Sequence, residues 1–431
     1  MVAFIGPIEL ESLVVMNVWI CIAYDPLPGI DRATRLLRYG ALAEQLAASG
    51  HSVVLWTSTF DHFQKKQRFN ANRSVQVSEN LRVELLHAPS YSKNVSWARM
   101  RHNRSLARAF TVRAKESQSP DIIFAGIPCL ELTEAAAQYS KEHSVPLIAD
   151  IQDIWPEVHV TLLPRLLRPF GRWVLSSEFK RAQRIFQAST AVTAVSRQYL
   201  DWGCALRGEH RGYDQVFHLG YRLPPPALLE SAKRRATEFR QRFRLPHDRI
   251  LTTFVGQFAA SYDVDTIIQA ARLLEAGKNH THFVLAGAGD KFARIKKSTQ
   301  GMTTVTLTGW LESQDTITLL QQSHMGLAAY SRSAPQSLPY KPFEYMAFGL
   351  PIINSLPGEL REIIKNHGIG EYYEAGDAHS LAVAVNAFAQ SPQKRELAGR
   401  RARELYVQQF DGELIANRLI THLERVFHDH C

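Results

Sequence analysis

Lys341 and Glu344 stand three residues apart in a segment whose residue types can bind a diphosphate and a pair of sugar hydroxyls. The segment runs from Pro339 to Glu359 and reads as a loop, a short helix, a buried strand and a second loop. The N-terminal turn of a helix presents free N–H groups that attract phosphate, and Lys341 on that turn adds a positive charge. We also place Glu344 on the first turn, where its carboxylate can accept hydrogen bonds from two hydroxyls. Together these groups suit a sugar nucleotide, with a cradle for the diphosphate and a clamp for the ribose.

The elements around this pair follow from the neighbouring residues. Pro342 suits the first helical turn because its missing N–H would be unpaired there. Gly349 can adopt the left-handed conformation that ends a helix. Residues 351–353 form a short apolar run that fits a strand buried on both faces.

The first half of the chain opens with a strand over residues 17–23, a turn that contains Gly29, and a helix over residues 32–48. Asp31 is a plausible N-cap for that helix. A further strand over residues 52–57 completes the opening of a doubly wound sheet, in which ligands bind at the carboxyl ends of the strands. A single glycine there fits an ordinary strand-to-helix turn equally well.

Asp153 lies just after a predicted strand over residues 145–149, in a stretch that also contains Gln152, Trp155 and Glu157. This mixture is too polar for a core, so we predict that it lines the space between two domains. The alternative is that Asp153 caps the helix that follows it.

Residues 163–188 combine six basic side chains with many aromatic and aliphatic ones, which permits two structures. The basic and apolar faces could rest on a membrane surface, with Arg168, Arg172 and Arg181 supplying charge. The favoured alternative is a solvated helix that packs its apolar side inward.

The prolines at residues 224–226 indicate a linker between two α/β halves, because consecutive prolines do not join a central strand. After it the pattern of strands and helices begins again, which predicts two Rossmann-like domains of parallel strands that face a central cleft. We predict these boundaries: an N-terminal extension at 1–15, an N-terminal domain at 16–222, a linker at 223–230, a C-terminal domain at 231–408 and a final helix at 409–431.

The composition is that of a globular protein, with 45% hydrophobic and 21% charged residues. The formal net charge of +9 favours an anionic substrate or lipid surface, and no nucleic-acid motif accompanies it. The four cysteines, Cys21, Cys129, Cys204 and Cys431, have no pair spacing, which favours a reducing compartment and argues against a disulfide frame or a zinc site.

From Met16 onward the chain resembles the retaining glycosyltransferases of family four, which have the GT-B fold. It is most similar to bacterial enzymes that build O-antigen, capsule or related surface glycans from amino-sugar donors. The strongest motif is Pro339-x-Lys341-x-x-Glu344-Tyr345-Met346-Ala347-x-Gly349-x-Pro351, followed by Gly358-Glu359. Supporting motifs are Gly50 to Val53, Asp61-His62 with Lys65, Lys66 and Arg68, Asp150 to Glu157, and Gly287-x-Gly289 with Gly309.

The resemblance implies a nucleotide-diphosphate donor, with a UDP-sugar favoured over GDP and an N-acetylated hexosamine as the sugar. It implies a glycan or polyprenyl-linked acceptor and a cytoplasmic enzyme that is peripheral on the cytoplasmic face of the inner membrane. The catalytic residues it implies are Lys341 and Asp153. The donor-binding residues it implies are Gly29, Gly256, Gly309, Trp310, Gln336, Lys341, Glu344 and Glu359.

The chain departs from the family pattern at three places. Gln336 stands where many relatives have a glutamate, and Gln152 where a histidine often precedes the aspartate. The loop at residues 256–262 has neither the arginine nor the lysine found in many relatives. The charge of the phosphates is therefore left to Lys341.

Departure of the diphosphate is the difficult step, and N–H groups with Lys341 can stabilise its growing charge. Attack from the same face needs no protein nucleophile, and we assign no general base. The sequence has no Asp-x-Asp pair and no His/Cys cluster with ligand spacing, so we expect a metal-independent enzyme with no cofactor beyond the donor. For His62 and His218 a structural hydrogen bond is favoured over a catalytic role, and Gly287-x-Gly289 fits an ordinary turn equally well.

Three other functions remain open. One is a sugar-nucleotide epimerase of similar fold, and another is a glycosyltransferase that acts on a soluble natural product. The third is a non-catalytic protein that binds a nucleotide.

Overall fold

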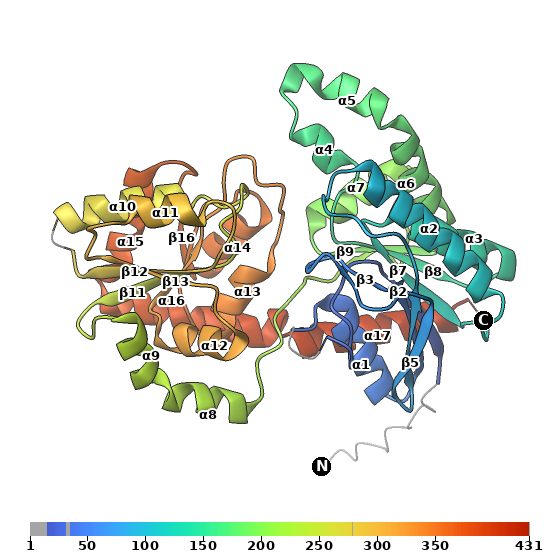
Figure 1. Ribbon diagram of the computed structural model, residues 1–431, viewed down its shortest axis with the longest axis horizontal. Coiled ribbons are helices and arrows are strands. Elements are labelled where there is room, and N and C mark those ends of the chain that lie inside the picture. The colour runs from blue at the N-terminus through green and yellow to red at the C-terminus, as the bar shows by residue number, and fades with distance from the viewer. Residues whose placement is uncertain (1–14, 32–34, 278, 431) are drawn as a thin grey trace, which may run out of the picture.

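The computed structural model describes residues 15–31, 35–277 and 279–430, which form two α/β domains (Figure 1). Each domain has one main sheet covered by helices, as the alternating strand and helix patterns predict. The fold class expected from the sequence is confirmed. The predicted N-terminal extension lies outside the described residues except for Val15.

The N-terminal sheet has eight strands in the order β10-β9-β8-β7-β1-β2-β6-β5. All neighbours are parallel except β5, which pairs antiparallel with β6 at one edge. Its strands are β1 (Asn17–Cys21), β2 (Ser52–Ser58), β5 (Arg73–Ser78), β6 (Leu81–Leu86), β7 (Ile122–Ile127), β8 (Leu147–Ile151), β9 (Ala191–Ala194) and β10 (Gln215–Val216). A separate hairpin joins β3 (Phe60–Asp61) to β4 (Lys66–Gln67). The parallel order brings the carboxyl ends of β1, β7 and β8 to one edge of the sheet.

The helices of this domain are α1 (Arg38–Ala48), α2 (Trp97–Ala114), α3 (Leu130–His143), α4 (Glu157–Thr161), η1 (Arg165–Leu167), α5 (Arg168–Val174), α6 (Ser176–Ala188) and α7 (Arg197–Arg207). The first of them starts later than predicted. Its N-cap is Leu37, and Asp31 instead pairs with Arg68, so Asp31 is not the cap. Residues 32–34, which begin the predicted helix, lie outside the described residues.

The C-terminal sheet has six parallel strands in the order β13-β12-β11-β14-β15-β16. Its strands are β11 (Ile250–Val255), β12 (Thr281–Ala286), β13 (Val305–Gly309), β14 (Met325–Ala328), β15 (Ile352–Asn354) and β16 (Gly370–Tyr372). Its helices are α8 (Pro226–Arg234), α9 (Ala236–Phe243), α10 (Val264–Ala276), α11 (Phe292–Ser298), α12 (Ser313–Gln322), α13 (Tyr340–Ala347), α14 (Glu359–His367), α15 (Ala378–Ala389) and α16 (Pro392–Leu405). Strand β11 lies inside the sheet, so its carboxyl end is central to the edge where ligands bind.

The chain crosses between the domains twice. The first crossing leads to α8, whose first residue is Pro226, so a helix occupies most of the predicted linker at 223–230. A proline at the first helical position needs no backbone donor, which is why the proline run could still begin a helix. The second crossing is a π-helical segment, η2 (Tyr406–Phe410), that continues into α17 (Gly412–His428).

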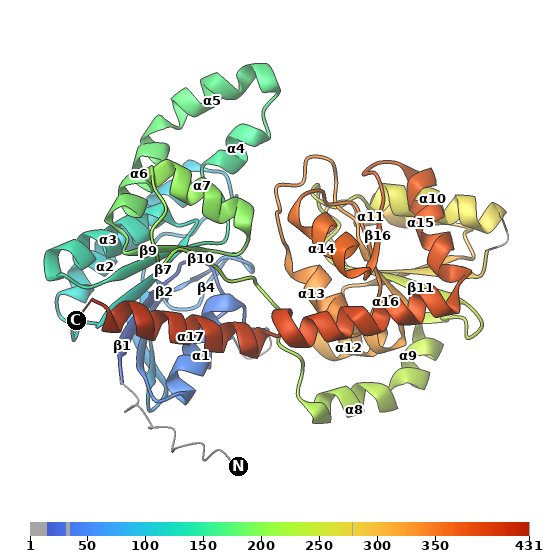
Figure 2. The same ribbon diagram turned by 180° about the vertical axis from the view of Figure 1, so that it is seen from behind.

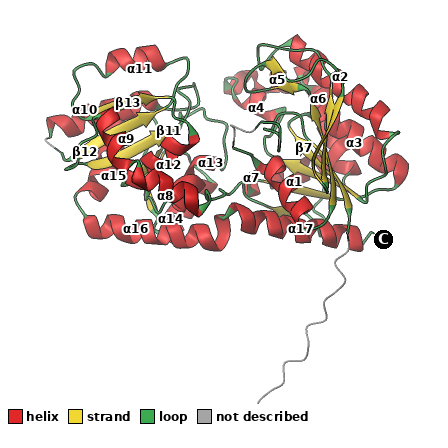
Figure 3. Cartoon of the chain, turned by 60° about the horizontal axis from the view of Figure 1, so that its bottom comes forward, coloured by secondary structure: helices red, strands yellow, loops and turns green. Residues whose placement is uncertain are grey.

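Helix α17 packs against the N-terminal domain (Figures 2 and 3). Its apolar residues join the core that contains Leu42, Leu46 and Phe217, and those residues are Ile415, Leu419, Ile420, Leu423 and Val426. The last helix is therefore part of the first domain, although it follows the second domain in sequence.

The segment α4–η1–α5 stands clear of the rest of the N-terminal domain (Figures 1 and 2). Leu166 is 94% exposed and Trp173 is 71% exposed, and the other exposed apolar side chains are Leu162, Leu167, Phe170 and Val174. The prediction that residues 163–188 pack their apolar side inward is therefore wrong for η1 and α5. It is confirmed for α6, whose Ala182, Ile185 and Phe186 are buried in the core. Inside the segment, Gly171 leaves room for Leu163, which would lie 2.5 Å from a Cβ at that position.

Candidate active site

The loops after β11, β12 and β13 are bound to one another at the carboxyl edge of the C-terminal sheet. Gly256 N–H donates to Ala286 O at 2.9 Å, and Gly287 N–H donates to Gly309 O at 2.7 Å. A Cβ at Gly287 would overlap the carbonyl of Gly256. The glycine pair at 287 and 289 is therefore required by close backbone approach, which the sequence left undecided.

Lys341 lies across Gly256. A Cβ at Gly256 would overlap Nζ of Lys341, so only glycine leaves the lysine in its present position. Lys341 belongs to the first turn of α13, with Pro339 as its N-cap. Pro342 follows in that turn and Gly349 has φ +65° just after the helix, as predicted. The structure thus brings two predicted donor residues, Lys341 and Gly256, into contact.

The ammonium group of Lys341 is surrounded by aromatic rings. Its Nζ lies 4.5 Å from the ring centre of Tyr262 and 5.6 Å from that of Phe254. Among the described residues, no carboxylate oxygen comes within 4.0 Å of it. A cation held by ring faces keeps its charge available, so this position can bind an anionic group.

Glu344 is one helical turn further along α13, in the second turn rather than the first. Its side chain is 15% exposed, and its Oε1 lies 3.8 Å from Nη1 of Arg35 in the N-terminal domain. Arg35 also lies over the rings of Tyr221 and Tyr340, at 4.3 and 5.4 Å. Burial raises the pKa of Tyr221, and the Glu344 carboxylate raises it further. Glu344 therefore faces the interdomain contact and retains an exposed portion that can accept hydroxyls.

Arg38 connects this helix to the N-terminal sheet, a contact that the sequence did not predict. Its guanidinium donates to both oxygens of Asp150 at 2.9 Å, and its backbone N–H donates to the hydroxyl of Tyr340 at 3.2 Å. Tyr39 also donates to Asp150, at 2.9 Å. A fully buried arginine–aspartate pair is strongly destabilising to break, so it fixes the carboxyl end of β8 against α1.

Asp153 follows β8 at this same end of the sheet. Burial raises its pKa to about 6, although the N–H of Ile154 and the charge of Arg99 oppose the rise. The N-cap of α4 is Pro156, so the alternative in which Asp153 caps that helix is wrong. The Asp153 charge contributes to the raised pKa of Tyr199, second to burial. Tyr199 in turn donates to Pro335 O across the domain boundary at 3.1 Å.

The remaining predicted donor residues are more dispersed. Glu359 begins α14 and accepts a hydrogen bond from the Arg197 N–H of the other domain at 2.9 Å. Trp310 is 63% exposed beside Gly309. Gln336 has a buried Oε1 that accepts no hydrogen bond within the described part of the chain. Such an orphaned acceptor is available to a ligand.

Gly29 has φ +70° and lies against Val77 of β5, which a Cβ at Gly29 would approach to 2.8 Å. That end of β5 pairs with Leu81, the first residue of β6, so it is far from the carboxyl end of β6. The glycine is required by this close packing. The atoms nearest to this position are those of the Val77 side chain.

The two histidines have structural hydrogen bonds. Nδ1 of His218 lies 2.9 Å from Val195 O, and Nδ1 of His62 lies 2.5 Å from the Tyr91 hydroxyl. Nε2 of His218 lies 3.9 Å from Oε1 of Glu359. His218 thus adds to the interdomain contact that Glu359 makes.

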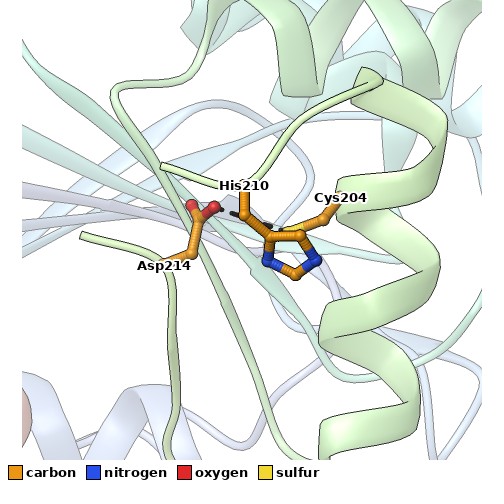
Figure 4. A group of neighbouring side chains, drawn as sticks. All are labelled: Cys204, His210 and Asp214. Carbon is orange, nitrogen blue, oxygen red and sulfur yellow. Dashed lines mark hydrogen bonds between the residues drawn. The ribbon is translucent and has the colours of Figure 1, made fainter. Parts of the chain in front are cut away.

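Cys204, His210 and Asp214 come together in a way that the sequence spacing did not suggest (Figure 4). Asp214 is paired with the buried guanidinium of Arg207 and accepts from the N–H groups of Arg211 and Val192. Burial raises the pKa of the Cys204 thiol to about 12. Within this group, the Asp214 carboxylate forms a buried ion pair with Arg207.

Two family models match the chain. Residues 235–405 match the model "Glycosyl transferases group 1", and residues 38–203 match the model "Glycosyl transferase 4-like domain". The chain is 23% identical over 198 residues to N-acetyl-alpha-D-glucosaminyl L-malate synthase of Bacillus anthracis, a match that covers 46% of this chain and 50% of that protein. It therefore spans about half the length of this curated relative.

Solved structures share the fold over almost the whole chain. Sucrose-phosphate synthase from Thermosynechococcus elongatus superimposes with a TM-score of 0.69 at 17% identity, covering 96% of this chain and 99% of that one. Anabaena HepE in complex with UDP-glucose has a TM-score of 0.63 at 16% identity, covering 95% and 100%. Identities this low establish the fold alone. The chain thus contains a glycosyl transferases group 1 domain at residues 235–405 and a glycosyl transferase 4-like domain at residues 38–203.

Proposed function

We propose that the chain transfers a sugar from a nucleotide-diphosphate donor to an acceptor hydroxyl. The observation that carries the proposal is the unpaired ammonium of Lys341, which lies over Gly256 at the carboxyl end of β11. The diphosphate binds this ammonium and the N-terminal turn of α13, where free N–H groups point outward. Trp310 offers an exposed ring for the base, and Glu344 accepts the ribose hydroxyls.

A UDP-sugar is the donor that the comparisons favour, since HepE binds UDP-glucose. The name of the Bacillus anthracis relative contains an N-acetylglucosaminyl group, which supports an N-acetylated hexosamine as the transferred sugar. The transfer proceeds with retention and without a metal. Lys341 stabilises the departing diphosphate, and Asp153 lies on the acceptor side.

For the acceptor we propose a glycan or polyprenyl-linked chain of a surface polysaccharide, such as O-antigen or capsule. The support is the segment α4–η1–α5, which exposes six apolar side chains together with Arg165. Such a surface suits peripheral binding to the anionic cytoplasmic face of a membrane. No helix within the described ranges combines the length and the hydropathy that crossing a bilayer requires.

A panel of nucleotide sugars, scored for nucleotide release with and without polyprenyl-linked acceptors, tests this function. We expect release from one UDP-sugar to depend on the acceptor. Release with formation of an epimer and no acceptor would support the epimerase alternative. Tight UDP binding with no consumption of any donor would support a non-catalytic protein and contradict the proposal.

A further inference from the structure

Six side chains form a closed ring of contacts at the carboxyl edge of the N-terminal sheet. We call this group the Lys65–Arg99 ring, and its members are Tyr24, His62, Lys65, Tyr91, Asn94 and Arg99. Arg99 lies over the ring of Tyr24 at 4.6 Å, and Lys65 lies over the ring of Tyr91 at 4.9 Å. The two tyrosines are joined through His62, whose ring lies 4.8 Å from that of Tyr24 and whose Nδ1 meets the Tyr91 hydroxyl.

The two cations meet at Asn94. Nζ of Lys65 donates to Oδ1 of Asn94 at 2.5 Å, and Nη1 of Arg99 donates to the carbonyl of the same residue at 2.9 Å. Both partners are neutral. Nη2 of Arg99 donates to none of the residues that the structure describes. Like charges held this close without an anion are unfavourable, so the pair is suited to a negatively charged ligand.

The nearby acids do not supply that anion. Asp61 pairs with Arg68 at 3.1 Å, and Glu131 accepts from Asn103 at 3.0 Å. The charge of Arg99 lowers the pKa of Asp153. Among the described residues, however, neither Lys65 nor Arg99 has a carboxylate oxygen within 4.0 Å. Lys65 and Arg99 therefore form no direct ion pair within the described residues.

The pKa shifts of the neighbouring groups agree with a positive electrostatic potential at the ring. Burial lowers the pKa of His62 to about 3, and the charges of Lys65 and Arg99 lower it further. Burial also lowers the pKa of Lys65, with Arg99 as the second cause. His62 is thus neutral and can take part in hydrogen bonding without adding a third charge.

Lys65 also has φ +55°, in the left-handed region that a side chain with a Cβ seldom adopts. The preceding turn fixes it there, because Asp61 accepts from the N–H groups of Phe63 and Gln64. Strained backbone of this kind is commonly retained where it positions a functional group. Here it directs the lysine toward Asn94.

We infer that the Lys65–Arg99 ring binds a phosphate group carried by the acceptor. A phosphate dianion matches the two positive charges, and its several oxygens can accept from Lys65 and Arg99 together. The inference rests on the proposed transferase function, because it assigns the ring to the acceptor that faces the donor across the domain boundary. The phosphate belongs either to a lipid-linked diphosphate or to a soluble sugar phosphate.

Titration of inorganic phosphate into the full chain saturated with UDP tests the ring without interference from the donor site. We expect Lys65→Met and Arg99→Leu to weaken phosphate binding roughly tenfold each, the usual effect of losing a charged hydrogen bond. Lys66→Met and Arg101→Leu, which remove exposed cations next to the same two positions, should change it less than twofold. Lys65→Arg should restore most of the affinity, which separates loss of charge from misfolding.

Geranyl diphosphate and glucose 1-phosphate as ligands distinguish the two sources of phosphate. Tighter binding of the first supports a lipid-linked acceptor, and tighter binding of the second supports a soluble one. Equal phosphate affinity in Lys65→Met, Arg99→Leu and the unsubstituted chain overturns the inference, as does no phosphate binding by the unsubstituted chain. UDP affinity is measured in every variant. If the unsubstituted chain does not bind UDP, the proposed function is contradicted. If UDP binds normally and the substitutions leave phosphate affinity unchanged, only the role of the Lys65–Arg99 ring is contradicted.

Discussion

Three residues around Lys341 explain why its positive charge can bind an anion. Gly256 has no Cβ, and a Cβ there would overlap the ammonium of Lys341. The rings of Tyr262 and Phe254 stabilise the charge of Lys341 without neutralising it. A carboxylate partner would have held the ammonium in an ion pair. In the proposed function, this charge stabilises the diphosphate that departs from the sugar.

Lys341→Met should lower turnover by about 10²-fold, similar to the loss of one oxyanion donor, because the charge acts on the departing diphosphate. Steady-state kinetics with the active donor measures this. Lys365→Met, which removes an exposed lysine of α14, is the control and should leave turnover unchanged. Normal kinetics in Lys341→Met would remove the lysine from the mechanism.

Glu344→Gln should raise the KM for the donor roughly tenfold with a smaller effect on kcat, because a charged acceptor for the ribose hydroxyls becomes a neutral one. The matched control is Glu362→Gln, at an exposed acid of α14. If the two variants have the same donor KM, the ribose does not bind Glu344.

The buried carboxyl group of Asp25 makes the stability of the protein depend on pH. Burial raises its pKa from 3.8 to about 7, so the folded protein favours the protonated acid. The stability that this group contributes is fully present below pH 3.8 and is lost as the pH rises through 7. The Asp25→Asn variant has no carboxyl group to ionise at this position. The difference between its free energy of unfolding and that of the unsubstituted chain should therefore rise by about 2–4 kcal/mol between pH 4 and pH 8.

Denaturant unfolding at a series of pH values measures this difference. Asp248→Asn, at an exposed position, should show no such trend. A difference that stays constant with pH would mean that Asp25 is ionised in the folded protein.

Residue types alone could predict the helix that carries Lys341 and Glu344, because the signals that start and end a helix act locally. They could not place Gly29, whose φ and contact with Val77 depend on an antiparallel edge strand, β5, that the sequence pattern did not reveal. Arg35 and Arg38 were missed because their partners are distant in sequence. Arg35 meets Glu344 of the second domain, and the guanidinium of Arg38 meets Asp150.

At the scale of elements, helix α13 and strand β15 form where the sequence predicts them. Their boundaries follow local signals, with Pro342 in the first turn and Gly349 just past the end. For the segment α4–η1–α5, by contrast, local signals do not decide which side chains are buried. The same alternation of arginine and leucine is compatible with packing inward or outward, and the choice depends on whether another element covers it.

The exposed side chains of this segment should bind anionic vesicles. Replacing Leu166, Phe170 and Trp173 by serine should reduce binding to phosphatidylglycerol vesicles at least tenfold, because their apolar area no longer enters the interface. Co-sedimentation measures the bound fraction. Stability should change little, since these side chains are exposed.

The control variant replaces three exposed apolar residues elsewhere, Val383, Leu397 and Val407, by serine. It should bind vesicles within twofold of the unsubstituted chain. Arg181 is not part of this surface, because it is paired with Glu134 and Glu178. Equal vesicle binding by both triple variants would exclude the segment as the membrane contact.

At the scale of the whole molecule, the chain returns to its first domain through α17, so both domain connections lie near one another (Figure 2). Arg197 with Glu359, Tyr199 with Pro335, and Arg38 with Tyr340 join the domains on the side of α13 and α14. The two-domain plan followed from the repeated strand and helix pattern. These contacts did not, because each joins residues that are more than 100 positions apart.

The central claim is that the donor diphosphate binds Lys341 while Glu344 holds the ribose. A crystal structure of the full chain with UDP tests it most directly. We predict a phosphate oxygen within hydrogen-bond distance of Nζ of Lys341 and both ribose hydroxyls facing the Glu344 carboxylate. UDP bound away from α13, with neither side chain in contact, would contradict the account.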